Sequence, residues 1–288
     1  MKKILCFIFV FLSFYLFLNY ILSDTNLLNK ILFNNMSLIS SKRSNETLKE
    51  INNIVISKQN ENLIKMLSLE KDNKESLVNL VIPDEPLVYI YNTHDKESYV
   101  NPDSSLYNID CNVKTASYIL QDKLLEYNIT SIVEERSPTS EVSKNKLDYP
   151  YTYSYSRKYL EEAIKKYPSV KIFIDLHRDG VSKEVSTAKI NGKNYAKLMF
   201  FLGLGHEKSE QNKKLVKELE SIIKEKYNGI LRDTFIRPND SYNQDLTPNS
   251  FLLEVGGNYN TIEEVYNSLE VLAYVLSSYL GDVSWEQN

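Results

Sequence analysis

The sequence contains little of several residue types that common chemistries require. Of its 288 residues only two are cysteines, eight are glycines, eight are prolines and three are histidines. Cys6 lies in an apolar N-terminal segment and Cys111 in the later, polar part, so we expect no disulfide between them. The glycines form neither the G-x-S-x-G elbow of serine hydrolases nor a phosphate-binding loop. The fold must therefore be held by its core and, where one binds, by a metal.

Positive charge is not in excess either. The formal net charge is −4, which gives no indication of nucleic-acid binding. Tyrosine, in contrast, is abundant at 21 residues. We attribute this mainly to the codon bias of an AT-rich genome; the alternative is that some exposed tyrosines form a surface on which carbohydrate stacks.

The N-terminus has the pattern of a membrane anchor. Lys2 and Lys3 precede an apolar run over residues 4–22 that only Ser13 and Asn19 interrupt. About 20 residues are needed to span a bilayer as a helix, and no small-residue cleavage site follows this run. We therefore expect an uncleaved anchor over residues 1–23, with a cleaved signal peptide as the alternative. The anchor would have a cytoplasmic N-terminus and the rest of the chain outside the membrane.

Two further segments follow the predicted anchor. Residues 24–83 are rich in Asn, Ser, Lys, Glu and Leu, with weak helical periodicity around Leu48 and Val55. This composition predicts a partly helical stalk that carries no catalytic pattern. Prolines in the segment Pro83–Pro86 interrupt helices and mark the start of a domain over residues 84–288.

Apolar runs alternate with amphipathic segments throughout this domain. Such alternation predicts an α/β fold, with a mixed, largely parallel sheet flanked by helices. We expect strands at residues 87–91, 129–133, 170–176, 197–204 and 251–255, and helices at residues 113–127, 153–167, 212–227 and 262–279.

Three polar side chains follow or end predicted strands. His94 follows the first apolar run, His177 ends the third, and Glu254 ends the last. Ligands and catalytic groups collect at the carboxyl ends of strands in α/β sheets. Catalytic zinc needs three protein ligands and an open position for water. The two histidines would supply two of these ligands, and an oxygen ligand has still to be identified. The remaining histidine, His206, lies in a loop, and we assign it no role.

The third ligand is open on sequence alone. Glu97, three residues after His94, is our first choice, and Asp95 and Asn108 are alternatives. Glu254 has a different expected role: burial at a strand end raises the pKa of a carboxyl group toward neutrality. It would then accept a proton from a zinc-activated water and deliver it to a leaving amine.

Several segments together resemble the stage II sporulation protein P family. The resemblance covers residues 86–280, in the family's order. It is carried by Tyr91-Asn92-Thr93-His94-Asp95-Lys96-Glu97-Ser98-Tyr99, Tyr153-Ser154-Tyr155-Ser156-Arg157, Asp175-Leu176-His177-Arg178-Asp179, Tyr242-Asn243-Gln244-Asp245-Leu246, Leu253-Glu254-Val255-Gly256 and Asn260-Thr261-Ile262-Glu263-Glu264.

The resemblance implies a peptidoglycan hydrolase of forespore engulfment. The family is described as a zinc-dependent N-acetylmuramoyl-L-alanine amidase with endopeptidase activity on stem-peptide cross-links, similar in fold to other zinc amidases. It acts with stage II sporulation proteins D and M between the two membranes of the sporangium. Carried over, His94 and His177 become zinc ligands and Glu254 the catalytic glutamate.

One departure affects the metal site. The family pattern begins His-Thr-His, and this chain has Asn92 in place of the first histidine and Asp95 after the second. We take His94 as the ligand because it is the one that is kept. Amidases place their ligand glutamate further along, near a helix start, which adds Asp110 to the alternatives for the third ligand.

The expected reaction attacks the amide between the muramic acid lactyl group and L-alanine. Arg178 or Arg157 would stabilise the developing oxyanion. Two other functions compete with the amidase: a membrane-tethered scaffold that binds peptidoglycan or a partner without cutting, and a metal-dependent peptidase without amidase activity. The presence of His94, His177 and Glu254 favours an enzyme over the scaffold.

Overall fold

The computed structural model describes three stretches of the chain: residues 46–58, 85–100 and 110–282. No helix within these stretches is both long and apolar enough to cross a membrane. The predicted anchor and the predicted domain boundary at residues 83–84 lie outside the described residues, so both stay predictions.

The chain divides into two compact units, residues 1–49 and 50–288. A helix runs over residues 46–58 and contains Leu48 and Val55, whose spacing suggested helical structure. The larger unit contains the sheet and the helices around it.

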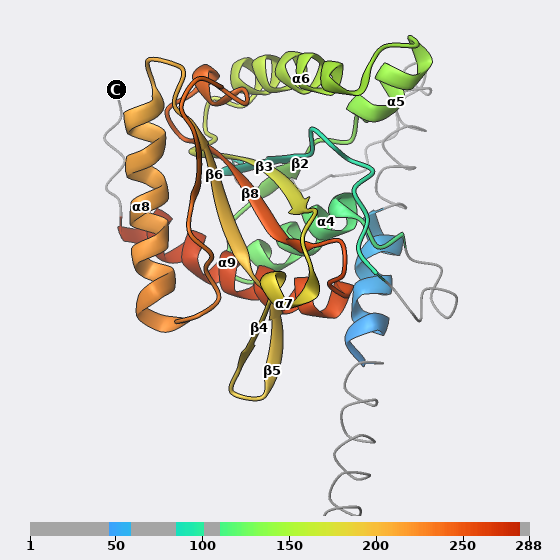
Figure 1. Ribbon diagram of the computed structural model, residues 1–288, viewed down its shortest axis with the longest axis vertical. Coiled ribbons are helices and arrows are strands. Elements are labelled where there is room, and N and C mark those ends of the chain that lie inside the picture. The colour runs from blue at the N-terminus through green and yellow to red at the C-terminus, as the bar shows by residue number, and fades with distance from the viewer. Residues whose placement is uncertain (1–45, 59–84, 101–109, 283–288) are drawn as a thin grey trace, which may run out of the picture. The chain divides into compact units, whose positions relative to one another are not determined.

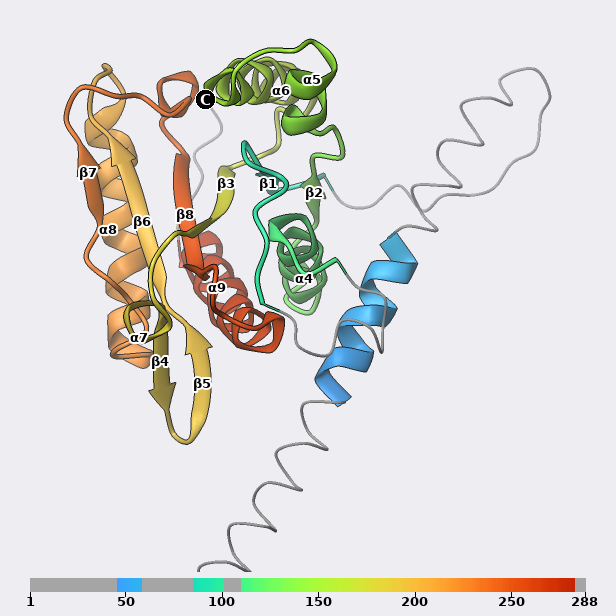
Figure 2. The ribbon, with the colours of Figure 1, turned by 45° about the vertical axis from the view of Figure 1, so that its right-hand side comes forward.

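A six-stranded sheet forms the centre of the larger unit, in the order β2-β1-β3-β8-β6-β7 (Figures 1 and 2). The first four strands in this order are parallel, β6 is antiparallel to β8, and β7 is parallel to β6. The predicted mixed, largely parallel sheet is thus confirmed. Its strands are β1 (Val88–Tyr91), β2 (Ser131–Val133), β3 (Ile172–Asp179), β6 (Leu198–Gly203), β7 (Phe235–Arg237) and β8 (Ser250–Gly257).

Both faces of the central strands are buried. Tyr89 and Phe173 point to one face, where they pack with Leu160 of helix α6 (Thr152–Lys166). Side chains alternate along a strand, so Ile90 and Ile174 point to the other face, and both are fully buried. Burial on both faces explains why these strands are continuous apolar runs rather than alternating ones.

Three longer helices complete the layers: α4 (Val113–Leu125), α8 (Ser209–Lys226) and α9 (Ile262–Asp282). Helix α9 packs against both α4 and α8 (Figure 2). Asn112 is the N-cap of helix α4: its side chain accepts a hydrogen bond from the Thr115 N–H, which fixes where the helix begins after the β1 loop.

Some elements were not predicted from the sequence. The antiparallel hairpin β4 (Thr187–Ile190) and β5 (Lys193–Ala196) extends from the sheet, as Figure 1 shows. It turns at Asn191 and Gly192, which both have positive φ, so the Asn-Gly pair was an available hairpin indicator. The short helices α5 (Pro138–Lys144) and α7 (Lys183–Ser186) and the exposed edge strand β7 lack long apolar runs.

Candidate active site

The carboxyl ends of neighbouring strands bring the two predicted histidines together. His94 lies three residues after β1, and His177 lies within β3, the strand paired with β1. Their rings are 5.0 Å apart between centroids. Glu97 reaches the same point because the chain turns after β1, where its N–H donates to the His94 carbonyl. The structure therefore gathers His94, Glu97 and His177 into one cluster.

The cluster has the dimensions of a zinc site. Glu97 Oε1 lies 3.4 Å from His94 Nδ1, and Glu97 Oε2 lies 3.4 Å from His177 Nδ1. One ligand atom from each residue lies within 4.8 Å of the others. Tetrahedral ligands about 2.1 Å from zinc are about 3.4 Å apart, so each histidine nitrogen lies at this distance from one oxygen of Glu97, and the three side chains are candidate zinc ligands.

Asp175 supports the His177 ring from behind. Its Oδ1 lies 2.9 Å from His177 Nε2, although the angle is not that of a standard hydrogen bond. The same carboxylate is almost fully buried and accepts hydrogen bonds from the N–H and the hydroxyl of Thr93. A carboxylate at Nε2 keeps the proton on that nitrogen and directs the lone pair of Nδ1 toward the cluster.

The protonation states of Glu97 and His177 depend on each other. Burial by itself would raise the pKa of Glu97, but hydrogen bonds with His177 and His94 outweigh it and hold the pKa far below its usual range. Burial likewise opposes charge on His177, yet Asp175 and Glu97 raise its pKa well above the ordinary value. A metal that binds at His177 must displace the proton that this raised pKa retains on the imidazole, so metal binding depends on pH.

Glu254 lies beside the cluster on β8. It is the direct register partner of His177 across the parallel β3–β8 pair. The residue keeps some contact with solvent, but its Oε2 is sealed from it and has no hydrogen-bond partner among the described residues. Burial, assisted by the negative charge of Glu97, raises the pKa of Glu254 to about 8, against the opposing effect of His177.

The other acidic side chains considered as third ligand have different surroundings. Asp95 is buried away from the histidines, where it accepts hydrogen bonds from the Thr139 N–H and the Ser137 hydroxyl at the start of α5. Asp110 is exposed and is not part of the cluster. Asn108 lies outside the described residues. Of the described alternatives, only Glu97 faces both histidines.

The two candidate arginines differ in their contacts. The Arg178 N–H donates to Glu97 Oε2, and its guanidinium donates to the carbonyls of Ser98 and Asp179 at the edge of the cluster. Arg157 instead forms a bidentate ion pair with Asp245, at 3.0 and 2.7 Å. Arg178 is therefore the arginine that remains beside the candidate site.

Tyr99 is a residue whose place in the site we did not predict. Its hydroxyl is buried and has no hydrogen-bond partner among the described residues. After burial itself, the nearby charges of Glu97 and Glu254 raise its pKa. Glu97 and Tyr99 are two residues apart in an extended segment, which points both side chains the same way. The two-residue spacing from Glu97 was the feature of the sequence that could have indicated Tyr99 as a site residue.

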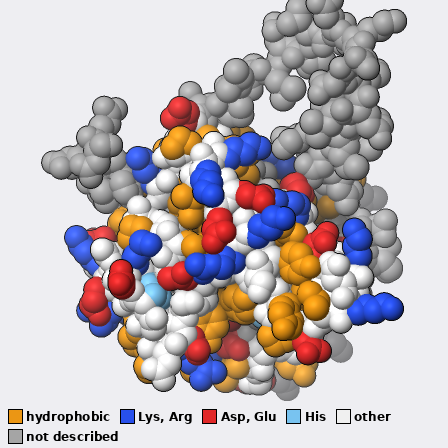
Figure 3. Space-filling model, turned by 90° about the horizontal axis from the view of Figure 1, so that it is seen from above, with side chains coloured by type: hydrophobic (Ala, Val, Ile, Leu, Met, Phe, Trp, Pro, Cys, Tyr) orange, Lys and Arg blue, Asp and Glu red, His pale blue; other side chains and the backbone are white. Residues whose placement is uncertain are grey.

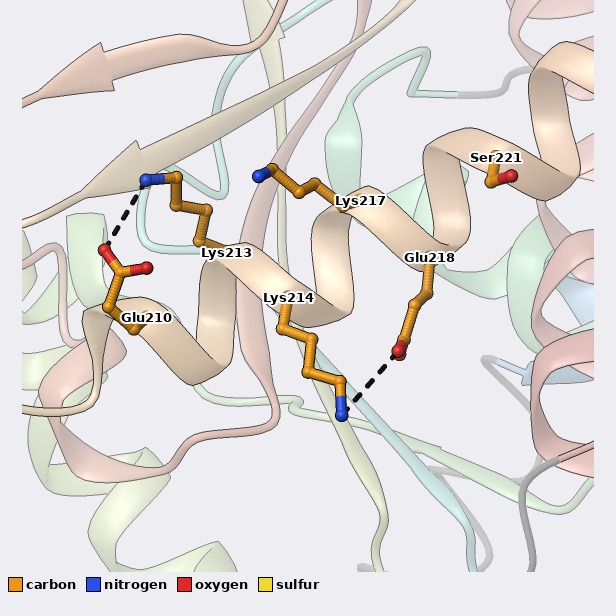
Figure 4. A pocket seen from close by; sticks show the side chains of 6 residues that line it. All are labelled: Glu210, Lys213, Lys214, Lys217, Glu218 and Ser221. Atoms are coloured by element: carbon orange, nitrogen blue, oxygen red, sulfur yellow. Dashed lines mark hydrogen bonds and ion pairs between the residues drawn. The ribbon is translucent and has the colours of Figure 1, made fainter.

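The surface away from the cluster has mixed charge. One hollow on α8 is lined by side chains of that helix alone, joined by the ion pairs Lys213–Glu210 and Lys214–Glu218 (Figure 4). This is a solvated helix face with no candidate catalytic group. Figure 3 shows another face, where Lys and Arg side chains lie among Asp and Glu.

Fold and site together define the class of protein. It is an α/β protein whose parallel strands present two histidines and a glutamate at their carboxyl ends, the donor set of a candidate zinc centre. The family model of stage II sporulation protein P matches residues 18–277. The stage II sporulation protein P of Bacillus subtilis (strain 168) is 32% identical over 210 residues, which are 69% of this chain and 52% of that protein. The chain belongs to the stage II sporulation protein P family, and its match spans about half the length of this relative.

Several solved amidase structures match this chain at low sequence identity and low TM-score. The CwlD amidase of Clostridioides difficile, solved in complex with the GerS lipoprotein, is 14% identical with a TM-score of 0.44. The amidase AmiC2 of Nostoc punctiforme is 13% identical with a TM-score of 0.41, and Ami1 of Mycobacterium smegmatis is 9% identical with a TM-score of 0.39. Each comparison covers 68% of this chain and 98% of the other. At these values the likeness carries no conclusion about activity.

Proposed function

We propose that the chain is a zinc-dependent peptidoglycan hydrolase of forespore engulfment, an N-acetylmuramoyl-L-alanine amidase that also cleaves stem-peptide cross-links. The observation that carries this proposal is the meeting of His94, Glu97 and His177 beside the unpartnered carboxylate of Glu254. Family membership supplies the substrate, and the site supplies the type of reaction.

The metal would be held by three side chains of this chain. His94 and His177 offer their Nδ1 atoms, and Glu97 offers a carboxylate oxygen. Zinc bound there supplies Lewis-acid chemistry and activates water at neutral pH. The remaining task of the protein is to orient the substrate amide and to handle protons.

Glu254 is suited to proton transfer. In the absence of a metal its pKa is about 8, so near neutral pH it changes between carboxylic acid and carboxylate at little cost. A cation in the cluster would lower this pKa and favour the carboxylate, the form that accepts a proton. The same group then returns the proton to the leaving amine of L-alanine.

Two donors are available for charge that develops on the amide oxygen. Arg178 lies at the edge of the cluster, and the Tyr99 hydroxyl is buried without a partner among the described residues. A donor that is already in place and sealed from water stabilises a developing oxyanion most effectively. We assign the electrostatic role to Arg178 and the hydrogen-bonding role to Tyr99.

Location and partners follow from the N-terminal sequence and the family. The apolar run at residues 4–22 supports a single-pass membrane anchor, with the catalytic domain in the space between the two membranes of the sporangium. Family membership supports joint action with stage II sporulation proteins D and M.

The test is mass spectrometry of peptidoglycan digested by the purified protein, with zinc and then with a chelator. We expect free stem peptides and peptide-free glycan, both lost with chelator. Glu254→Gln should remove more than about 99% of turnover, since it deletes a general acid–base group, while zinc content stays at the level of the parent. Full activity in this variant contradicts the assignment. Products that never appear, even with protein D added, favour the scaffold alternative.

A further inference from the structure

Six aromatic rings form a continuous chain of contacts that leads from the metal cluster to the edge of the sheet. The chain begins at Tyr149, which stacks on the candidate zinc ligand His94, and ends at Phe235 on the edge strand β7. The successive centroid distances are 4.6 Å for Tyr149–His94, 5.4 Å for His94–Tyr153, 5.6 Å for Tyr153–Tyr242, 4.8 Å for Tyr242–Phe201 and 4.9 Å for Phe201–Phe235.

These rings are not core residues. Tyr149 is 50% exposed and Phe235 is 45% exposed, and the four rings between them are partly exposed. Aromatic residues that only fill a core would be sealed, as Tyr89 and Phe251 are in the same domain. The six rings, which we call the aromatic track, therefore present ring surface to solvent on the way to the candidate site.

The turn that carries Tyr242 is fixed in a costly conformation. Tyr242 and Asn243 have φ of 49° and 60°, in the left-handed region that side chains other than glycine rarely adopt. The Asn243 side chain donates to the Tyr153 carbonyl and to the Ser156 hydroxyl, which ties the turn to α6. These bonds offset the conformational cost and hold the Tyr242 ring against Tyr153.

The same turn is also tied to β6. The Gln244 side chain donates to the Phe201 carbonyl and accepts from the Gly203 N–H. A Cβ at Gly203 would lie 2.4 Å from the Asp240 carbonyl oxygen, so only glycine lets the loop approach this closely. The Tyr-Asn-Gln-Asp segment thus positions Tyr242, and through it the middle of the track.

The two arginines beside the Tyr242 turn already have carboxylate partners. Arg157 beside the turn pairs with Asp245, and Arg237 on β7 lies 3.9 Å from Asp240. A carboxylate-bearing peptide would need a cation that is not already neutralised, whereas the apolar face of a sugar ring needs only an aromatic surface. The chemistry therefore favours a neutral saccharide.

We propose that the aromatic track binds the glycan strand, stacking successive sugar rings between the metal cluster and β7. This deepens the proposed function, on which it rests, because it names the part of the substrate that this surface holds. Stacking on accessible aromatic ring surface is tolerant of sequence and adds affinity ring by ring, as in single-stranded nucleic-acid channels.

The test is equilibrium binding of chitohexaose, a neutral chain of β-1,4-linked N-acetylglucosamine without peptide, to the full-length protein by calorimetry. Tyr149→Ala and Phe235→Ala should each weaken binding about two- to tenfold, the value of one aromatic contact. Both positions are exposed, so neither variant should unfold. Tyr242→Ala should weaken binding as well, and Tyr242→Phe, which keeps the ring, should bind like the parent.

Tyr127→Ala is the matched control. Tyr127 is 42% exposed but follows the C-terminal end of α4 and contacts Tyr274, outside the track. Because β1 and β2 are parallel, α4 runs from the carboxyl end of β1 to the amino end of β2. Tyr127 therefore lies at the amino ends of the strands, away from the candidate site. Chitohexaose binding should be unchanged in this variant.

Three results would overturn the proposal: no binding by the parent, equal binding by all variants, or binding of a synthetic stem peptide but not of chitohexaose. The last result would assign the track to the peptide. The two proposals fail separately. A parent that releases peptides from peptidoglycan but ignores chitohexaose retains the proposed function without the track, and a parent that binds chitohexaose but releases nothing retains the track alone.

Discussion

Replacing Asp175 with asparagine should weaken zinc binding while the protein stays folded. Asp175 is buried, and its Oδ1 lies 2.9 Å from Nε2 of His177. Asparagine has the same shape and can still accept from the Thr93 N–H. The substitution removes the negative charge that fixes the His177 tautomer and makes Nδ1 more basic as a metal ligand.

The expected magnitude follows from this single contact. Loss of a carboxylate behind a metal-binding histidine lowers metal affinity about 10- to 100-fold. At about 1.4 kcal/mol per factor of ten, this corresponds to about 1.4–2.8 kcal/mol. At a fixed zinc concentration well above both dissociation constants, the zinc-dependent gain in stability should shrink by the same amount.

The assay is competition for zinc against a chromophoric chelator at fixed pH, with the parent and D175N side by side. Thermal unfolding with and without zinc gives an independent reading of the same difference. A dissociation constant within twofold of the parent would refute the role of Asp175, and with it the assignment of His177 Nδ1 as the ligand atom.

Asp95→Asn is the matched control for this experiment. Asp95 directly follows His94 but accepts hydrogen bonds at the start of α5. The variant should lose about 1 kcal/mol of stability as a weakened helix N-terminus and keep its zinc affinity. If D95N lost zinc and D175N did not, Asp95 rather than Glu97 would be the acidic ligand.

Three further predictions concern stability. In metal-free protein, burial raises the pKa of Glu254 from 4.5 to about 8, so the folded state keeps a proton that the unfolded chain releases. The stability that this bound proton contributes is complete below pH 4.5 and is lost as the pH rises to about 8. Glu254→Gln should therefore make the unfolding temperature in chelator less dependent on pH over that range. A parent and variant with parallel pH profiles would contradict this. Gly203→Ala places a Cβ 2.4 Å from the Asp240 carbonyl oxygen and should cost about 1–3 kcal/mol in urea unfolding, while Gly180→Ala, which meets no atom within 4 Å, should cost less than about 1 kcal/mol. Asn260→Ala removes a buried side chain with three hydrogen bonds, including the one from the Gly257 N–H, and should cost about 3 kcal/mol in the same assay; a loss under about 1 kcal/mol would mean that water replaces them.

The main strands and helices could be predicted because buried positions are occupied by apolar residues, which form runs or regularly spaced stripes in the sequence. Strand β3 is buried on both faces and is a continuous apolar run, and α8 has a stripe that includes Leu215 and Leu219. The edge strand β7 has all three residues exposed, so its sequence contains no such run. The β4–β5 hairpin is likewise half-exposed, and only its Asn191-Gly192 turn indicated it.

The order of the strands follows from no local pattern. His177 and Glu254 are 77 positions apart in the chain, and they are neighbours because β8 inserts beside β3 rather than at the edge of the sheet. Position at a strand end indicated that such residues could meet, since parallel strands share a carboxyl edge. Which strands adjoin depends on how the helices pack.

The sequence by itself determined the α/β class, the family and the side chains that could bind metal, because apolar runs, strand-end histidines and contiguous motifs are local properties of the chain. Only the tertiary structure decided which acidic side chain faces the histidines: Asp95 and Glu97 are two residues apart, yet one joins the start of α5 and the other lies 3.4 Å from both imidazoles. It also decided that Arg157 pairs with Asp245 and that Tyr242 lies against Tyr153. The physical reason is that direction and distance between side chains are set by the turns and packing that bring distant segments together.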